Sequence, residues 1–204
     1  MQQTLRPATE RELERFIADA AHARMPLEIV GAGTKRTVGR PTNAAVSLTT
    51  QSLAGVSLYE PTELVMGARA GTLLTRVESE LSGRGQMLAF EPIDLGPVLG
   101  ETAGRGTIGA VFATNLSSSR RIMAGGARDH LLGIEAVAGT GQAFRNGGRV
   151  MKNVTGYDLC RGVAGSWGTL AVMASVTFKV LPRPEQTATL VFFGLEDTAA
   201  VELL

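Results

Sequence analysis

The sequence predicts an α+β fold in which short strands alternate with a few amphipathic helices and glycine-rich loops. Residues 170–180 are apolar at every even position, and three of the odd positions are polar, which is the two-residue period of a half-buried strand. Residues 10–23 instead place apolar side chains at helical spacing. A third observation is a short apolar stretch, residues 27–30, that leads directly into a glycine-rich loop at residues 31–35.

Composition excludes several classes of function. Glycine contributes 25 of the 204 residues, mostly between apolar runs, which indicates tight turns and loops laid against a ligand. A net charge of +1, with scattered basic residues, argues against nucleic acid as a partner. Cys160 is the single cysteine, so no intrachain disulfide or cysteine metal cluster can form, and we predict no metal site. Residues 1–11 lack a signal peptide's apolar core, and no apolar run is long enough to span a membrane. We therefore predict a cytoplasmic protein. Attachment to the inner membrane face through partners remains an alternative.

The first helix has a defined beginning and end. Thr9 and Glu12 form a capping-box pattern at its start, and Pro26 prevents its continuation. The strand at residues 27–30 follows, and residues 45–48 read as another strand.

The loop at residues 31–35 admits several motif interpretations. A Rossmann fingerprint needs a third glycine where this chain has Arg36, and the Gly-Lys-Ser/Thr ending of a Walker loop is absent. The remaining functional interpretation is an anion-binding nest of consecutive backbone amides, assisted by the Thr34 hydroxyl. An ordinary turn at a strand end stays open as the alternative.

The middle of the chain alternates strands and helices. Residues 59–61 read as a turn and residues 64–70 as a strand, followed by a helix that the glycines at 83 and 85 stop. A long loop at residues 90–106 precedes a stretch of small residues at 107–115, whose backbone can press against a flat ligand.

The last third predicts a hairpin, a helix and two strands. Residues 131–138 form a strand that turns at 139–141 into 143–145, and a short helix starts within 155–159. The glycine-bracketed turn 165–168 leads into the strand at 170–180, which Pro182 and Pro184 end. Residues 187–193 read as a further strand and 196–204 as the start of a helix.

A set of collinear segments gives the chain a specific resemblance. The segments are VMKNV at 150–154, GYDL at 156–159, GS at 165–166, Gly168 and KVLPRP at 179–184, together with the loop at 31–35 and the small-residue stretch at 107–115. In order and spacing they resemble the vanillyl-alcohol oxidase / PCMH-type family of FAD-linked oxidases, and within it the E-type FAD-binding subunits of bacterial glycolate oxidases.

The resemblance implies a domain organisation. It predicts a PCMH-type FAD-binding domain of two α/β lobes, one with a small, mostly parallel sheet and one with a larger, mostly antiparallel sheet. We expect the first lobe, with the pyrophosphate loop, at residues 1–58, the second lobe at 59–184, and the start of a truncated cap domain at 185–204.

The resemblance also implies the cofactor and its contacts. The cofactor is FAD, held without a covalent bond, because the loop carries no histidine where some family members attach the flavin, and Cys160 and His130 lie in other segments. The expected FAD-binding residues are Gly31, Ala32, Gly33, Thr34, Lys35, Pro92, Thr107, Ile108, Gly109, Ala113, Thr114, Asn115, Ser118, Arg128, Asp129 and Tyr157.

The activity implied is oxidation of a small 2-hydroxy acid, glycolate to glyoxylate, with electrons passed to a second flavin subunit and an iron–sulfur subunit. No convincing pair of carboxylate-binding arginine and base stands out, so the catalytic residues stay unassigned. Asp158 is expected near the isoalloxazine or, alternatively, as a helix cap. A non-catalytic flavin-binding assembly module and, more weakly, a nicotinamide-dependent dehydrogenase remain as alternatives.

Overall fold

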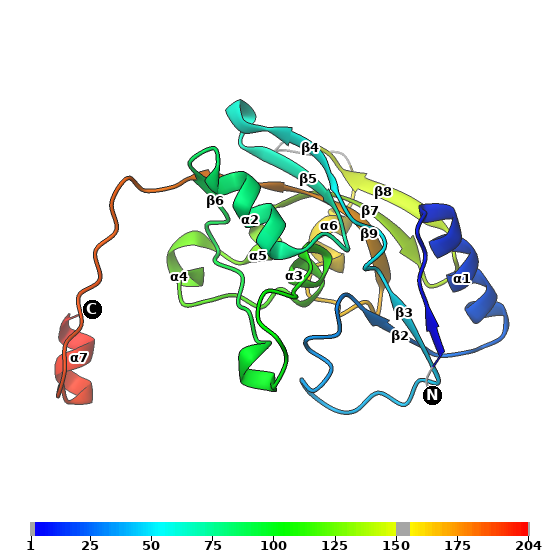
Figure 1. The fold of residues 1–204 in the computed structure, drawn as a ribbon, viewed down its shortest axis with the longest axis horizontal. Helices are drawn as coiled ribbons and strands as arrows, with labels where there is room; N and C mark the ends of the chain where they lie inside the picture. Colours follow the sequence, from blue (N-terminus) through cyan, green and yellow to red (C-terminus); the bar gives the residue numbers. More distant parts are fainter. Residues whose placement is uncertain (1–2, 150–155, 204) are drawn as a thin grey trace.

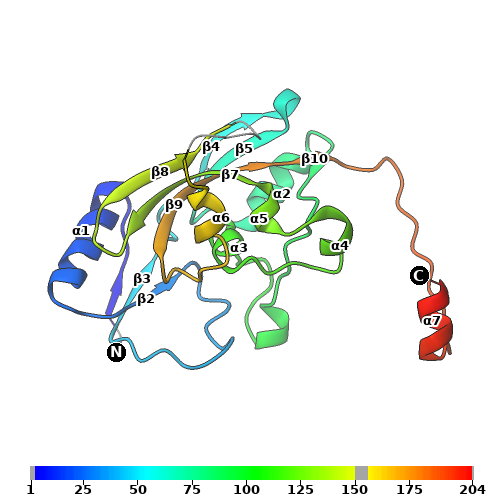
Figure 2. The same ribbon diagram turned by 180° about the vertical axis from the view of Figure 1, so that it is seen from behind.

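The structure is a computed structural model that describes residues 3–149 and 156–203. The segment 150–154 that contributes to the family resemblance, and the expected helix start at residue 155, lie outside the described residues. Two sheets lie side by side with helices around them, and the last part of the chain extends away from both (Figures 1 and 2). None of the helices in the described ranges is both long enough and apolar enough to cross a bilayer.

The smaller sheet is parallel and has the order β1-β3-β2. It consists of β1 (Gln3–Leu5), β2 (Leu27–Val30) and β3 (Val46–Thr49). The helix α1 (Glu10–His22) begins as predicted, because the Glu12 amide donates to Thr9 Oγ1 over 3.2 Å and the Glu12 carboxylate accepts from the Ala8 amide over 2.7 Å. The sequence did not reveal β1, which is only three residues long.

The larger sheet is antiparallel and has the order β4-β5-β9-β7-β8. Its strands are β4 (Val56–Glu60), β5 (Val65–Arg69), β7 (Leu131–Ala138), β8 (Ala143–Gly147) and the central β9 (Ala171–Lys179). The predicted alternation of β9 is confirmed from Ser175 onward, whereas its first four residues are all buried. That half is covered on both faces, since Met173 belongs to the main core and Val172 to the cluster that contains α1. A small parallel sheet beside a larger antiparallel one confirms the predicted fold class.

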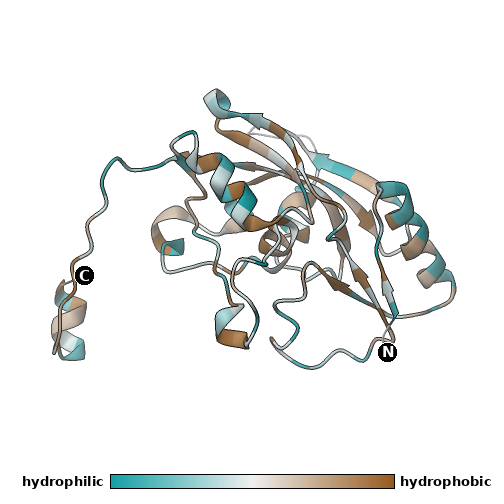
Figure 3. Ribbon diagram, viewed as in Figure 1, coloured by the Kyte–Doolittle hydropathy of each residue, from teal (hydrophilic) through white to brown (hydrophobic). Residues whose placement is uncertain are grey.

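Helices and short turns complete the structure. They are η1 (Pro61–Glu63), α2 (Leu74–Ser82), η2 (Pro97–Leu99), α3 (Ile108–Thr114), α4 (Arg121–Ala124), α5 (Ala127–His130), α6 (Leu159–Val163) and α7 (Asp197–Leu203). The main core contains buried apolar residues of α2, α3 and the larger sheet, and Figure 3 shows the apolar colouring along these strands. A second cluster, which includes Leu13, Leu48 and Val137, joins α1 and the smaller sheet to the larger one.

Two secondary-structure predictions are wrong. Tyr59 and Glu60, expected in a turn, belong to β4, because they pair with Met66 and Val65 of β5. Residues 187–193, expected to form a strand, have no regular structure and are exposed, because no described strand lies beside them to complete a ladder.

The chain before that segment also differs from expectation. Pro182 does not end all pairing, because β10 (Leu181–Pro182) forms a two-residue antiparallel ladder with β6 (Gln86–Met87). The ladder is an edge pairing, in which proline is tolerated.

The division into lobes at 1–58 and 59–184 and a cap segment at 185–204 stays a prediction. Its first boundary falls inside β4, so we propose residues 50–55, between β3 and β4, as the junction of the two lobes.

Candidate functional site

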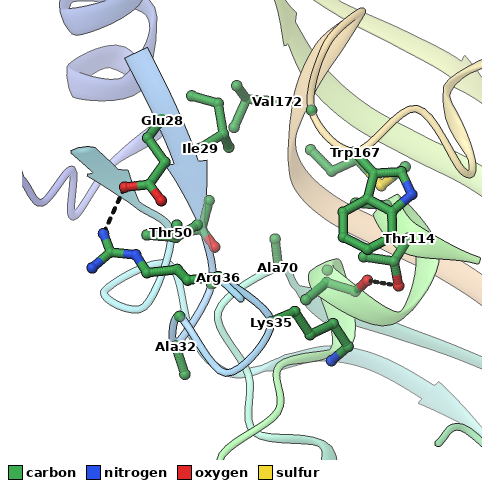
Figure 4. A pocket seen from close by; sticks show the side chains of 18 of the residues that line it. Glu28, Ile29, Ala32, Lys35, Arg36, Thr50, Ala70, Thr114, Trp167 and Val172 are labelled. Carbon is green, nitrogen blue, oxygen red and sulfur yellow. Dashed lines mark hydrogen bonds and ion pairs between the residues drawn. The ribbon is translucent and has the colours of Figure 1, made fainter. Parts of the chain in front are cut away.

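A cleft of about 370 Å³ lies where the two sheets meet. One wall is β2 and the loop that follows it, and the other consists of α3, the turn at residues 167–169 and the start of β9 (Figure 4). Its volume is in the range of ligand sites, and most of its wall side chains are small or apolar.

The loop at residues 31–35 presents backbone donors that no described residue accepts from. The amides of Gly31, Ala32, Gly33, Thr34 and Lys35 donate no hydrogen bond to any described residue. Gly33 has φ +78°, which turns the chain in a way that glycine permits without strain. The loop is anchored from behind, since Thr49 Oγ1 donates to the Gly31 carbonyl over 2.7 Å. A series of unused amides at a cleft is an anion-binding arrangement.

Two cations leave this loop in opposite directions (Figure 4). Arg36 turns back to β2 and β3, where it donates to Glu28 Oε2 and Ser47 Oγ, each over 2.8 Å. Lys35 extends toward the α3 wall. Burial lowers the pKa of the Lys35 ammonium, and the negative charge of Asp94 partly opposes that shift. Arg36 is therefore placed to hold the loop, and Lys35 to meet an anion.

Little room is left for a side chain where the loop meets Thr107, just before α3, and where Gly109 of α3 meets Ala70, just after β5. A Cβ on Gly31 would lie 2.3 Å from Thr107 Oγ1, and a Cβ on Gly109 would lie 2.6 Å from Ala70 Cβ. Side chains at either position would separate these segments. The α3 residues that line the cleft beyond this contact are Gly109, Ala110, Ala113 and Thr114, so the helix offers a low wall of small side chains.

Eight of the predicted FAD-binding residues line this cleft. They are Gly31, Ala32, Gly33, Thr34, Lys35, Gly109, Ala113 and Thr114. Thr107 and Ile108 are fully buried behind them, and the Ile108 side chain belongs to the main core. Thr107 Oγ1 is buried without a hydrogen-bond partner among the described residues.

The other six predicted residues do not line the cleft and have other neighbours. Asn115 Oδ1 accepts from the Arg128 amide over 2.9 Å, and Asp129 Oδ2 accepts from the Gly126 amide over 2.8 Å. Ser118 donates to Glu91, Pro92 pairs with Ser117, and Tyr157 is 88% exposed. Their role in binding FAD stays a prediction. Asp158 accepts from the Arg161 amide over 3.1 Å, so it caps α6, as its alternative interpretation held.

Several cleft residues were missed by the sequence interpretation. Trp167 lies in the glycine-bracketed turn that the sequence predicted, and this turn could have indicated it as a cleft residue. Ile29, Thr50 and Ala70 carried no such signal, because only the packing of the two sheets decides which strand residues face the cleft.

Neither His130 nor Cys160 lies at the cleft. His130 is 4% exposed, with its Nε2 atom 2.8 Å from the Ala124 carbonyl and its ring 5.1 Å from that of Phe90. Burial raises the pKa of the Cys160 thiol to about 11, so the thiol is protonated at neutral pH.

These features define a two-sheet domain with an anion-binding loop of backbone amides beside a cleft. The chain belongs to the FAD binding domain family, which matches residues 1–147, and its cofactor is therefore FAD. The cleft fits this cofactor, since it offers free amides and Lys35 for a diphosphate and small side chains for the flat parts of the dinucleotide.

Individual relatives within this family are similar to the chain over most of its length. The chain is 41% identical to glycolate oxidase subunit GlcE of Escherichia coli over 85% of this chain and 47% of that protein. It is 29% identical to an uncharacterized FAD-linked oxidoreductase of Mycobacterium tuberculosis and 26% identical to glycolate oxidase subunit GlcD of Bacillus subtilis, over 90% of this chain and 38% of each relative. The chain thus spans less than half the length of these relatives. A solved alkyldihydroxyacetonephosphate synthase has the same fold, with a TM-score of 0.70 at 20% identity over 90% of this chain and 32% of that one.

Proposed function

We propose that the chain is the FAD-binding domain of a glycolate oxidase-type flavoprotein subunit. In this function it supports oxidation of a small 2-hydroxy acid, glycolate to glyoxylate, and electrons pass to partner subunits. The observation that carries the proposal is the run of unused amides at residues 31–35, which suits a diphosphate, together with 41% identity to a glycolate oxidase subunit.

Each part of the cleft has a task in this proposal. The loop amides donate to the diphosphate, Lys35 neutralises its charge, and Arg36 holds the loop through Glu28. Bound FAD supplies the redox chemistry, while the protein supplies binding and orientation. The proposal includes non-covalent attachment, since the described side chains that line the cleft include no histidine, cysteine or tyrosine.

Partners are part of the proposal. A second flavin subunit and an iron–sulfur subunit would receive the electrons, since one cysteine in this chain is too few for a cluster that takes four thiolates. The cytoplasmic location predicted from the sequence belongs to the same proposal.

One observation favours a second candidate, a non-catalytic flavin-binding assembly module. Among the described residues that line the cleft, Glu28 is the one carboxylate, and it accepts hydrogen bonds from Arg36 and Ser47. Proton removal from a hydroxy acid needs a base in hydrogen-bond reach. In the second candidate a partner provides that base and oxidises the substrate.

Absorption spectroscopy separates these candidates. We expect the purified 204-residue chain to be yellow and to release free FAD when it is denatured. Flavin that stays attached to the denatured chain would contradict non-covalent binding, and a colourless chain that binds no added FAD would contradict the proposal itself. Bleaching by glycolate under anaerobic conditions would favour the enzyme, and a spectrum unchanged by glycolate would favour the assembly module.

A further inference from the structure

The turn that carries Trp167 is held between the two walls of the cleft. The Trp167 amide donates to the Ala113 carbonyl over 2.9 Å, and the Gly165 amide donates to the Phe112 carbonyl over 3.1 Å, which ties the turn to the end of α3. On the other side, a Cβ on Gly168 would lie 3.1 Å from Ile29 Cβ. The backbone at Trp167 is therefore fixed by both α3 and β2.

Trp167 has an unusual conformation and unusual exposure. Its φ is +56°, a region that bulky residues rarely occupy, and a residue held there raises the energy of the fold. Its side chain is not in the core, because 42% of the residue is exposed, and the indole lies at the cleft beside Thr114 (Figure 4). A large aromatic ring beside small side chains offers a flat surface for a planar ligand group.

The cleft differs in chemistry between its two ends. Lys35 lies at the end formed by the loop, whereas Ile29 and Val172 lie at the other end, and Trp167 lies on the α3 wall beside Thr114 (Figure 4). From this apolar end a second hollow of about 190 Å³ extends between α1, β2 and the start of β9. The two hollows share two residues of β2 and four residues that follow Trp167 or open β9, namely Leu27, Ile29, Gly168, Thr169, Ala171 and Val172.

We propose that Trp167 is the stacking wall for the adenine ring of the bound dinucleotide. The inference rests on the proposed function, since it takes FAD as the ligand. Adenine is favoured over the isoalloxazine because the wall on which Trp167 lies, made by α3, residues 167–169 and the start of β9, carries no ionisable side chain, whereas a reactive flavin ring needs charge or dipoles that tune its nitrogens. Backbone groups and π-stacking are sufficient for a purine.

The test compares two variants with the same backbone constraint. Trp167→Phe keeps an aromatic ring, and Trp167→Leu removes it while keeping an apolar side chain without β-branching. Dissociation constants for FAD, ADP and FMN are measured on the flavin-free 204-residue chain. We expect Trp167→Leu to bind FAD and ADP about 10-fold more weakly, in line with base–aromatic stacking, and to bind FMN like the native chain. Trp167→Phe should stay within about twofold for all three ligands.

The native chain gives an independent readout, because Trp167 is its single tryptophan. ADP should change the tryptophan fluorescence at saturation, and thermal unfolding of the flavin-free variants checks that both are folded. Equal FAD affinity for native and Trp167→Leu chains would overturn the inference while leaving FAD binding intact. A loss confined to FMN would assign the indole to the isoalloxazine and overturn the adenine assignment. Failure of the native chain to bind FAD would instead overturn the proposed function.

Discussion

The two sheets contribute strands of different burial to the cleft. All four residues of β2 in the smaller sheet are only partly buried, and the strand ends in a loop whose amides donate to no residue in the described part of the chain. In the larger sheet, the first four residues of β9 are buried and both of its neighbours are hydrogen-bonded to it. The groups placed to bind an anion therefore follow a partly buried strand, β2, while the buried start of β9 supplies the opposite wall.

The largest expected effect tests this difference in packing. Phe178→Ala removes a fully buried ring that lies 5.3 Å from that of Phe112, so it should lower the free energy of unfolding by about 3–5 kcal/mol. Ile29→Ala, in the partly buried β2, should lower it by about 1–2 kcal/mol, below the range for buried sites. Urea denaturation of the two flavin-free variants measures both values. Equal losses would show that β2 and β9 are packed alike.

The contact between the loop and α3 gives the next largest effect. Gly31→Ala places a methyl group against Thr107 Oγ1, so the loop or the Thr107 side chain must move, and FAD affinity should fall about 10-fold if the loop moves. Adding Thr107→Ala removes that oxygen and leaves the nearest atoms at 3.5 Å, so the double variant should recover most of the affinity. Titration of the flavin-free chains with FAD measures this. A double variant as weak as Gly31→Ala would exclude the steric explanation.

Lys35 should make the affinity for FAD depend on pH. Because burial lowers the pKa of Lys35, the ammonium loses its proton below the usual 10.5, and the cation that neutralises the diphosphate is then lost. FAD affinity should therefore fall as the pH rises through that lowered pKa. Lys35→Met should bind about 5- to 10-fold more weakly at neutral pH and lack this alkaline decline. An identical pH profile in the variant would remove Lys35 from the site.

The same pKa shift has a consequence for the flavin-free protein. A lysine whose pKa is lower in the folded than in the unfolded chain makes the unfolded state bind more protons between the two values. Stability of the flavin-free chain should therefore rise with pH across that window, and Lys35→Met should remove this contribution.

The smallest expected effect concerns the Arg36 contact behind the loop. The Arg36 side chain is 44% exposed, so its ion pair with Glu28 contributes little to global stability. Glu28→Gln should change the free energy of unfolding by less than about 1 kcal/mol and weaken FAD binding by about two- to threefold. Calorimetry and FAD titration provide the two values. A large loss of stability would show that the pair supports the fold rather than the loop.

Local signals in the sequence predicted a good part of the fold. The Thr9 cap, the loop after residues 27–30 and the polar alternation from Ser175 onward depend on neighbouring residues, and the structure contains each of them. Eight of the candidate site residues also meet at one cleft, because they lie on two segments that the family pattern marks.

The failures share a physical cause, which is dependence on distant partners. Tyr59 is a strand residue because β5 pairs with it, and residues 187–193 are not a strand because no described strand does. Trp167 becomes a cleft residue through hydrogen bonds and contacts to α3 and β2, segments far away in the sequence. Such information is absent from any short stretch of the chain.

The most direct test follows the loop amides themselves in solution. In ¹H–¹⁵N spectra of the labelled, flavin-free chain titrated with FAD, the amide protons of residues 31–35 should move downfield as they begin to donate to the diphosphate. Saturable FAD binding that leaves these five signals where they were would contradict the account.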